Sequence, residues 1–200
     1  MQRRADKWVE CPAHVCHLAS VNRRIGRTRT CSPERAVAVL ARAAVDGRFP
    51  HWVDGLSVLA AFDAPEWLLA DQLSRPPHLA MTGQERQLWG SVNLDEPSGF
   101  VAVVSSWQPD AHLREAAVEA LAGRRGPVIA SALAVRLLDD VAEVRAAALR
   151  ALRPQLSAEV AAPVLAVLTA AGDRHHALEA IEAVRGVLRA EEGADLDTRG

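Results

Sequence analysis

An internal repeat in the C-terminal half of the chain constrains its fold more than any other feature. Residues 113–121, LREAAVEAL, align with residues 144–152, VRAAALRAL, at an offset of 31 positions. A weaker third copy, residues 180–184, aligns with residues 148–152 at an offset of 32. Self-similarity at a period of this length is typical of proteins that stack copies of one supersecondary unit.

Each copy has the residue pattern of a closely packed amphipathic helix. Alanine at the inner positions lets neighbouring helices approach, and Leu or Val at every third or fourth position fills the layer between them. A second apolar helix is expected next to these copies, over residues 128–138 and 157–171. Because one such pair cannot bury its apolar face alone, the pattern predicts stacked helix pairs over residues 107–190.

Residues 108–121, QPDAHLREAAVEAL, resemble the first helix of a HEAT or HEAT-like (PBS-lyase-type) repeat, and residues 140–152 resemble the same helix again. The resemblance implies an all-α fold of the armadillo-like kind, a right-handed α-solenoid of antiparallel helix pairs. A repeat of this family identifies a fold and leaves the function open.

The resemblance also implies a structural role for four charged residues. In such repeats an acid at the helix entrance and an arginine a few residues later link neighbouring repeats in a ladder of charged hydrogen bonds. By this resemblance Asp110 acts with Arg114, and Asp140 acts with Arg145. The third copy has Ala177 where the arginine is expected, so the ladder is expected to end there.

The first half of the chain shows helix signals without a clear repeat. Half of all residues are hydrophobic, there is no Tyr and only three Phe, so strong strand formers are scarce. Residues 32–106 are therefore expected to form degenerate helix pairs, beginning at Ser32-Pro33-Glu34 and with a capping box from Asp63 to Glu66. Residues 100–104 read as helix or strand, and helix is preferred because no second strand candidate lies nearby to pair with them.

The two ends of the chain are expected to be irregular. Residues 1–31 lack helical or strand periodicity and are rich in Arg, Cys and His, which predicts a flexible arm or a start codon placed too far upstream. Residues 191–200, EEGADLDTRG, are expected to form an acidic flexible tail beyond the last helix.

Charge and hydropathy argue against nucleic acid and membrane as partners. The formal net charge is −2, and only residues 1–30 carry a basic excess, of about +5. A protein that neutralises phosphates normally carries a larger basic surface. No apolar run approaches the roughly 20 residues of a membrane span. Reduced cysteines and the absence of a convincing signal sequence predict a cytoplasmic location, and the arginine-rich, alanine-rich composition suggests a GC-rich bacterial genome.

One group of residues has the chemistry of a metal site. Cys11, His14, Cys16 and Cys31 are soft ligands of the type that zinc prefers. Their spacing matches none of the usual zinc motifs, so the alternative is a locally packed or irregular arm without a metal. No other cofactor is expected.

Four further residues are candidates for a binding surface. Trp52 and Trp67 would form an aromatic platform if exposed, and would pack in the core between irregular helix pairs if buried. Arg124 and Arg125 occupy a predicted turn, where they contact a partner or remain solvated.

The sequence contains no recognisable catalytic constellation or phosphate-binding glycine loop. The preferred interpretation is a noncatalytic protein–protein interaction scaffold. Two alternatives remain at this point: a HEAT-fold enzyme or nucleic-acid-acting protein, similar to bilin lyases or DNA glycosylases, and a fragment of a larger repeat-containing regulatory protein.

Overall fold

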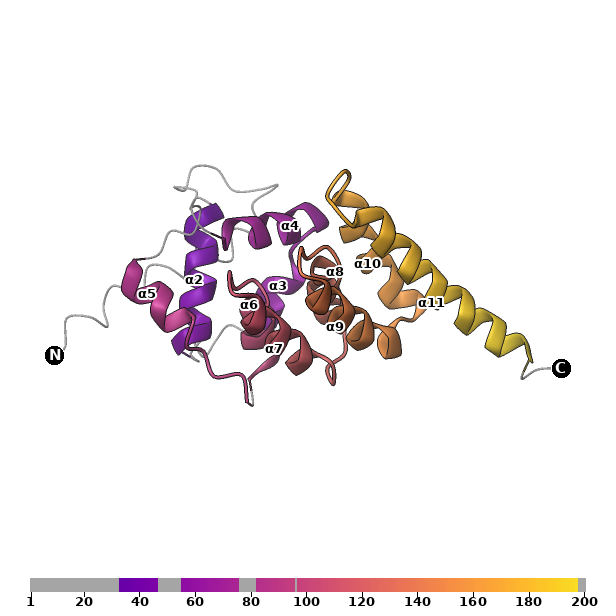
Figure 1. Cartoon of the computed structure of the whole chain (residues 1–200), viewed down its shortest axis with the longest axis horizontal. Helices are drawn as coiled ribbons and strands as arrows, with labels where there is room; N and C mark the ends of the chain where they lie inside the picture. The colour runs from indigo at the N-terminus through magenta and orange to yellow at the C-terminus, as the bar shows by residue number, and fades with distance from the viewer. Residues whose placement is uncertain (1–32, 47–54, 76–81, 96, 198–200) are drawn as a thin grey trace.

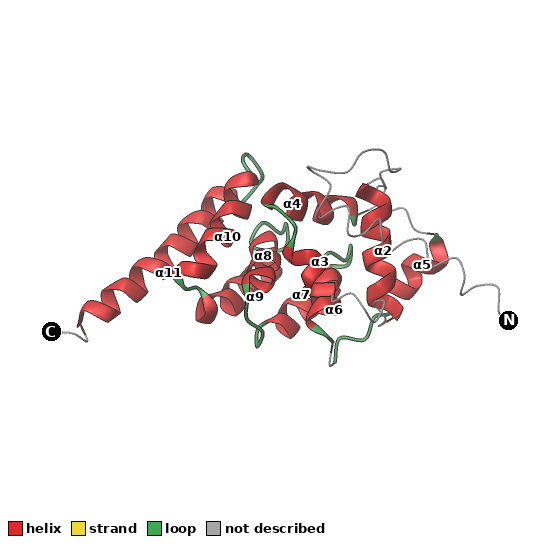
Figure 2. Cartoon of the chain, turned by 180° about the vertical axis from the view of Figure 1, so that it is seen from behind, coloured by secondary structure: helices red, strands yellow, loops and turns green. Residues whose placement is uncertain are grey.

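Helices make up the regular structure of this chain in the computed structural model, which describes residues 33–46, 55–75, 82–95 and 97–197 (Figure 1). That part of the chain contains no β-strand, which confirms the all-α prediction (Figure 2). The elements are α2 (Pro33–Asp46), α3 (Gly55–Ala60), α4 (Ala64–Leu73), α5 (Gly83–Trp89), α6 (Gly99–Ser105), α7 (Ala111–Leu121), α8 (Pro127–Arg136), α9 (Ala142–Leu152), η1 (Arg153–Gln155), α10 (Ala158–Ala170) and α11 (Ala177–Asp197).

Local capping signals fix where several of these helices begin. The predicted capping box at α4 is present: Asp63 accepts a hydrogen bond from the Glu66 backbone, and Glu66 accepts one from the Asp63 backbone, at 2.9 and 2.8 Å. At α6 the Ser98 hydroxyl accepts a hydrogen bond from the Val101 N–H at 3.2 Å. The ambiguous segment after Gly99 is therefore helical, as preferred from the sequence.

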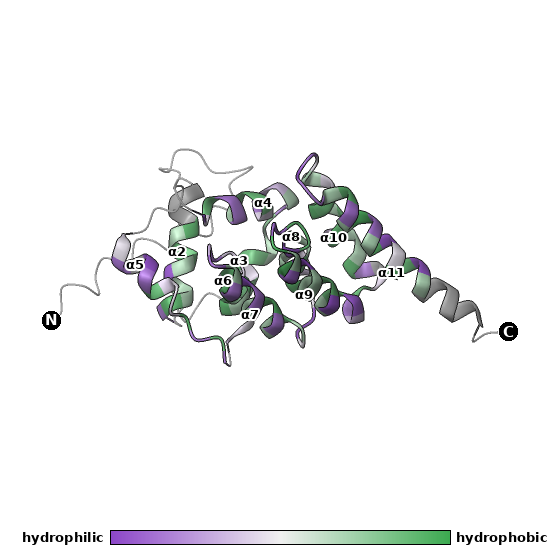
Figure 3. Ribbon diagram, in the orientation of Figure 1, coloured by the Kyte–Doolittle hydropathy of each residue, from purple (hydrophilic) through white to green (hydrophobic). Residues whose placement is uncertain are grey.

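The C-terminal helices pack side by side in two sets. Helix α7 packs against α9, α8 packs against α10, and α11 packs against α10. The hydrophobic residues concentrate on the helices that lie inside, and α2 and α10 are predominantly apolar (Figure 3). All residues of 129–139 are buried, so α8 is enclosed on every side after its first two residues, as expected for the central helix of a core.

Helix α4 connects the first half of the chain to the repeats. It packs against α2, α8 and α10. Its Trp67 meets the ring of Phe62 edge-on at 5.6 Å and the ring of Trp107 at 6.1 Å. Only 3% of Trp67 is exposed, so the hypothesis that it belongs to a binding surface is wrong. A large aromatic side chain is the natural filler between helices that do not repeat regularly. Trp52 lies outside the described residues.

The prediction of a flexible tail over residues 191–200 is also wrong for most of that segment. Helix α11 continues to Asp197. Glu and Ala are good helix formers, and Gly193 alone costs too little to end a helix that has no proline. The predicted irregular arm, residues 1–31, lies outside the part of the chain that the structure describes. None of the described helices is both long and apolar enough to cross a membrane.

Candidate functional site

A cluster of buried arginine and aspartate side chains lies between α4, α7 and α8. Its centre is Asp139, in the turn that follows α8, with its side chain fully buried. The guanidinium group of Arg114, on α7, donates two parallel hydrogen bonds to this carboxylate: Nε to Oδ2 at 2.8 Å and Nη2 to Oδ1 at 2.9 Å. Such a bidentate pair is the strongest arrangement available to these two groups.

Arg136, the last residue of α8, extends the cluster to α4. Its Nη1 donates to Asp139 Oδ2 at 2.9 Å, and its Nη2 donates to Asp71 Oδ1. Arg136 is completely buried and Asp71 is 7% exposed. An ion at such a position is tolerated only when it is paired and hydrogen-bonded, so α4 and α8 are held in one fixed relation.

Two more arginines stand at the edge of the cluster. Arg75, one turn beyond Asp71, places Nη2 at 3.5 Å from Asp71 Oδ1 and 3.7 Å from Asp139 Oδ2. Arg174 places Nη1 at 3.8 Å from Asp71 Oδ2 and donates from Nη2 to the Leu68 carbonyl at 3.3 Å. About a third of each of these two side chains is exposed: 30% for Arg75 and 34% for Arg174.

The pKa of Asp139 is lowered from its ordinary value of 3.8. Burial acts in the opposite direction and would raise this pKa, but the Arg114 hydrogen bonds, the Arg136 charge and the Val141 N–H together outweigh it. Asp139 therefore stays ionised near neutral pH. Both of its oxygens accept hydrogen bonds from the protein, which suits a structural anchor better than a group that exchanges protons with a substrate.

The ladder predicted by resemblance is present only in part: Arg114 pairs with a carboxylate, but Asp110 and Asp140 are not the acids of the ladder, and Arg145 contacts carbonyls rather than a carboxylate among the described residues. Arg114 pairs with Asp139, whereas Asp110 caps its own helix by accepting from the His112 N–H at 2.8 Å. Asp140 is exposed, and Arg145 bonds to its carbonyl rather than to its carboxylate. The reason is the turn after α8, which directs the first of two adjacent aspartates inward and the second to solvent.

The two ladder arginines nevertheless make the same backbone contacts. Arg114 Nη1 donates to the carbonyls of Gln108 and Pro109, at 3.0 and 2.7 Å. Arg145 Nη1 donates to the carbonyls of Asp139 and Asp140, at 2.7 and 3.1 Å. Each of the three positions is displaced by the 31 residues of the sequence repeat. The alignment also sets Gln108 opposite Asp139, and both residues are buried in the structure.

Arg124 and Arg125 are adjacent in sequence but line different hollows. Arg124 is held by the carbonyls of Ala120 and Pro97 and lies in an open hollow of about 540 Å3. Arg125 is exposed and lies in a second hollow of about 310 Å3. The first hollow is lined by Leu94, Asp95, Pro97, Ala116, Glu119, Ala120 and Arg124, and the second by Arg125, Gly126, Pro154, Gln155, Leu156, Ser157 and Val160.

The candidate zinc ligands Cys11, His14, Cys16 and Cys31 lie outside the described residues. Within residues that the structure does describe, no three His, Cys, Asp or Glu side chains come together as a metal site. Comparison of the chain with protein-family models, with curated proteins and with solved structures gives no match in any of the three.

Proposed function

We propose that the chain is a noncatalytic interaction scaffold of HEAT-like repeats, in which α7–α8 and α9–α10 are successive units of a right-handed α-solenoid. The observation that carries this proposal is the repeated backbone contact of Arg114 and Arg145, since it is the same bond in the same place one period later. The buried charges of the site are paired with one another and serve the fold. The surface of the repeat helices is then the part of the chain that is available to bind a partner.

The two hollows support this reading because three of the seven lining positions of each are related by the period of the repeat. Three residues that line the first hollow are followed 31 positions later by residues that line the second: Leu94 by Arg125, Asp95 by Gly126, and Arg124 by Gln155. The turns that contribute residues to the two hollows lie along one edge of the molecule (Figure 1). Two related hollows along one edge fit the extended binding surface that stacked repeats present to a protein segment.

Site-specific crosslinking tests this function. One variant carries a photoreactive residue in place of Ala116, which lines the first hollow. The matched control carries the same photoreactive residue in place of Ala162, which is exposed on α10. In the native host we expect a protein to crosslink at residue 116 and not at residue 162. The purified partner should then bind the intact chain, and Glu119→Arg, in the first hollow, should weaken this binding at least about tenfold, which corresponds to 1.4 kcal/mol.

Several results would overturn the proposal. A partner that crosslinks equally at both positions would remove the repeated edge as the binding surface. Nucleic acid or a chromophore recovered at residue 116 instead of protein would favour the nucleic-acid or lyase alternative. Glu119 is more than half exposed and, within the described part of the chain, its one ion pair is with Arg150 at the surface, so its substitution is expected to leave folding intact.

A further inference from the structure

The charged cluster around Asp71 and Asp139 contains more positive than negative charge. Among the described residues, the two aspartates have four arginines within 4 Å: Arg75, Arg114, Arg136 and Arg174. The group therefore carries a formal surplus of two positive charges. Charges at a half-buried position interact more strongly than charges in water. The surplus at this cluster therefore acts more strongly on a nearby ion than the same charges would in open solvent.

The surplus can be assigned to particular side chains. Arg114 makes a bidentate pair with Asp139, and Arg136 bonds to both Asp139 and Asp71, so each buried carboxylate already has a buried partner. Arg75 and Arg174 remain, and these are the two whose side chains are about one-third exposed. The unbalanced charge thus lies where the cluster opens to solvent.

The same two side chains also have unused hydrogen-bond donors. A guanidinium group carries five N–H donors. The Arg75 guanidinium group donates no hydrogen bond to the residues that the structure describes, and its approaches to Asp71 and Asp139 are long, at 3.5 and 3.7 Å. The Arg174 guanidinium group donates one hydrogen bond to a described residue, at the Leu68 carbonyl. Behind them, the fully buried Nε of Arg136 has no partner in the described part of the chain.

We propose that Arg75 and Arg174 form the mouth of an anion site that takes a phosphate monoester or inorganic phosphate. Both guanidinium groups lie within 4 Å of the same carboxylate, that of Asp71, so they are close together before any ligand arrives. A phosphate dianion matches the surplus of two charges, and its oxygens match the planar donor fork of arginine. This anion site lies at the C-terminal end of α4, next to Arg174. It is separate from the two hollows of the proposed protein-binding edge.

Titration of the full chain with inorganic phosphate tests this site. Phosphate is added at a mildly alkaline pH, where inorganic phosphate is mostly the dianion, against sodium chloride at equal ionic strength, while NMR follows the arginine Nε–H resonances. We expect saturable shifts of the Arg75 and Arg174 signals with a millimolar Kd. Arg75→Gln or Arg174→Gln should weaken binding about tenfold or more, since a hydrogen bond to a charged group contributes about that factor.

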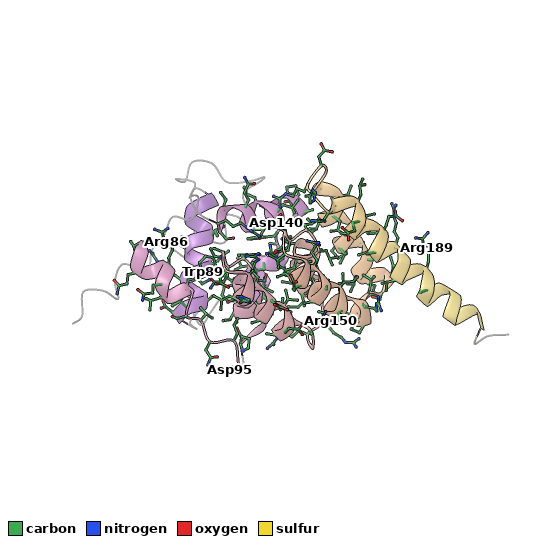
Figure 4. All side chains as sticks on the ribbon, in the orientation of Figure 1. Arg86, Trp89, Asp95, Asp140, Arg150 and Arg189 are labelled. Carbon is green, nitrogen blue, oxygen red and sulfur yellow. The ribbon has the colours of Figure 1, made fainter. Side chains whose placement is uncertain are left out.

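Two further variants separate a site from general basicity. Arg150→Gln removes an exposed arginine on α9, which lies on another edge of the molecule (Figure 4), and should leave the affinity unchanged. Arg75→Lys keeps the charge without the fork and should bind with intermediate affinity. Circular dichroism of each variant confirms that it is folded, and Arg75→Gln is the safer of the two removals because the Arg75 side chain, unlike that of Arg174, donates no hydrogen bond to the described backbone.

The outcome decides the proposal in either direction. Absence of saturable shifts up to tens of millimolar phosphate, or equal weakening by Arg150→Gln, would overturn it, whatever the fate of the scaffold proposal. If phosphate binds, glycerol phosphate and a phosphoserine peptide identify the natural source. Tighter binding of the peptide indicates a phosphorylated protein segment, and tighter binding of glycerol phosphate indicates a small phosphorylated molecule.

Discussion

Asp71 and Asp139, 68 positions apart in the sequence, are bound by the same buried guanidinium group, that of Arg136. Asp71 belongs to α4 in the first half of the chain, and Asp139 belongs to the turn between two repeat helices. A charged hydrogen bond of this kind is directional, so it fixes the orientation of α4 on the repeat helices as well as its distance.

Removal of the central carboxylate should be severely destabilising. Asp139→Asn leaves Arg114 and Arg136 as buried charges without their main partner, and breaking such a pair costs about 3–5 kcal/mol. Asp140→Asn is the matched control, because Asp140 is exposed, and should change the free energy of unfolding by less than about 0.5 kcal/mol. Urea denaturation measures both. Equal effects of the two substitutions would contradict the assignment of Asp139 as the buried anchor.

The pH dependence of stability should carry the signature of Asp139. Its pKa is lowered in the folded state, so the unfolded chain binds the proton first as the pH falls. The stabilisation is complete well above 3.8, the ordinary pKa, and is lost as the pH falls below that value toward the folded pKa. Denaturation of the wild type and Asp139→Asn at a series of pH values should show their difference shrinking below pH 3.8. A constant difference would show that the pKa of Asp139 is not lowered.

Gly55 should not tolerate a side chain. A Cβ atom at this position would lie 2.5 Å from Cδ2 of the buried Phe100 ring. We expect Gly55→Ala to destabilise the protein by about 1–3 kcal/mol, the usual cost of overpacking. Gly186, on the exposed side of α11, has open space around it, and Gly186→Ala should stabilise by about 0.5–1 kcal/mol through helix propensity. Thermal denaturation compares the two, and a stabilising Gly55→Ala would show that the Phe100 ring moves aside at little cost.

The capping box of α4 should contribute modestly to stability. Asp63→Ala removes the acceptor of the Glu66 N–H and is expected to cost about 1 kcal/mol. Asp63→Asn keeps an acceptor and should cost much less. Chemical denaturation of both variants checks this ordering. If both variants lose the same amount, the charge of Asp63 rather than its hydrogen bond stabilises the helix.

Local signals in the sequence predicted local structure well. The start of α2 at Pro33 and the capping box at Asp63 follow from side chains within a few positions of one another, whereas the helical state of residues 100–104 follows from the lack of a partner strand nearby. The 31-residue register predicted two arginines that occupy equivalent backbone positions. Helix α11 is an exception, because the acidic composition of its last turns suggested flexibility although its residues favour a helix.

The partners of the buried arginines could not be read from the sequence. Asp139 and Asp140 are adjacent and chemically identical, and only the backbone turn decides which of them faces inward. Asp71 lies in a segment without repeat character, so no periodicity connects it to Arg136. The burial of Trp67 likewise depends on contacts with Trp107, 40 positions away, which no local pattern indicates.

The link through Arg136 changes how this chain should unfold. In an array in which each repeat touches only its neighbours, the ends can melt while the middle persists. Here α4 packs across both α8 and α10, and its Asp71 bonds to the last residue of α8. Detachment of α4 would leave Arg136 with one carboxylate partner fewer in the buried interior, so the first half of the chain and the repeats are bound into one cooperative unit.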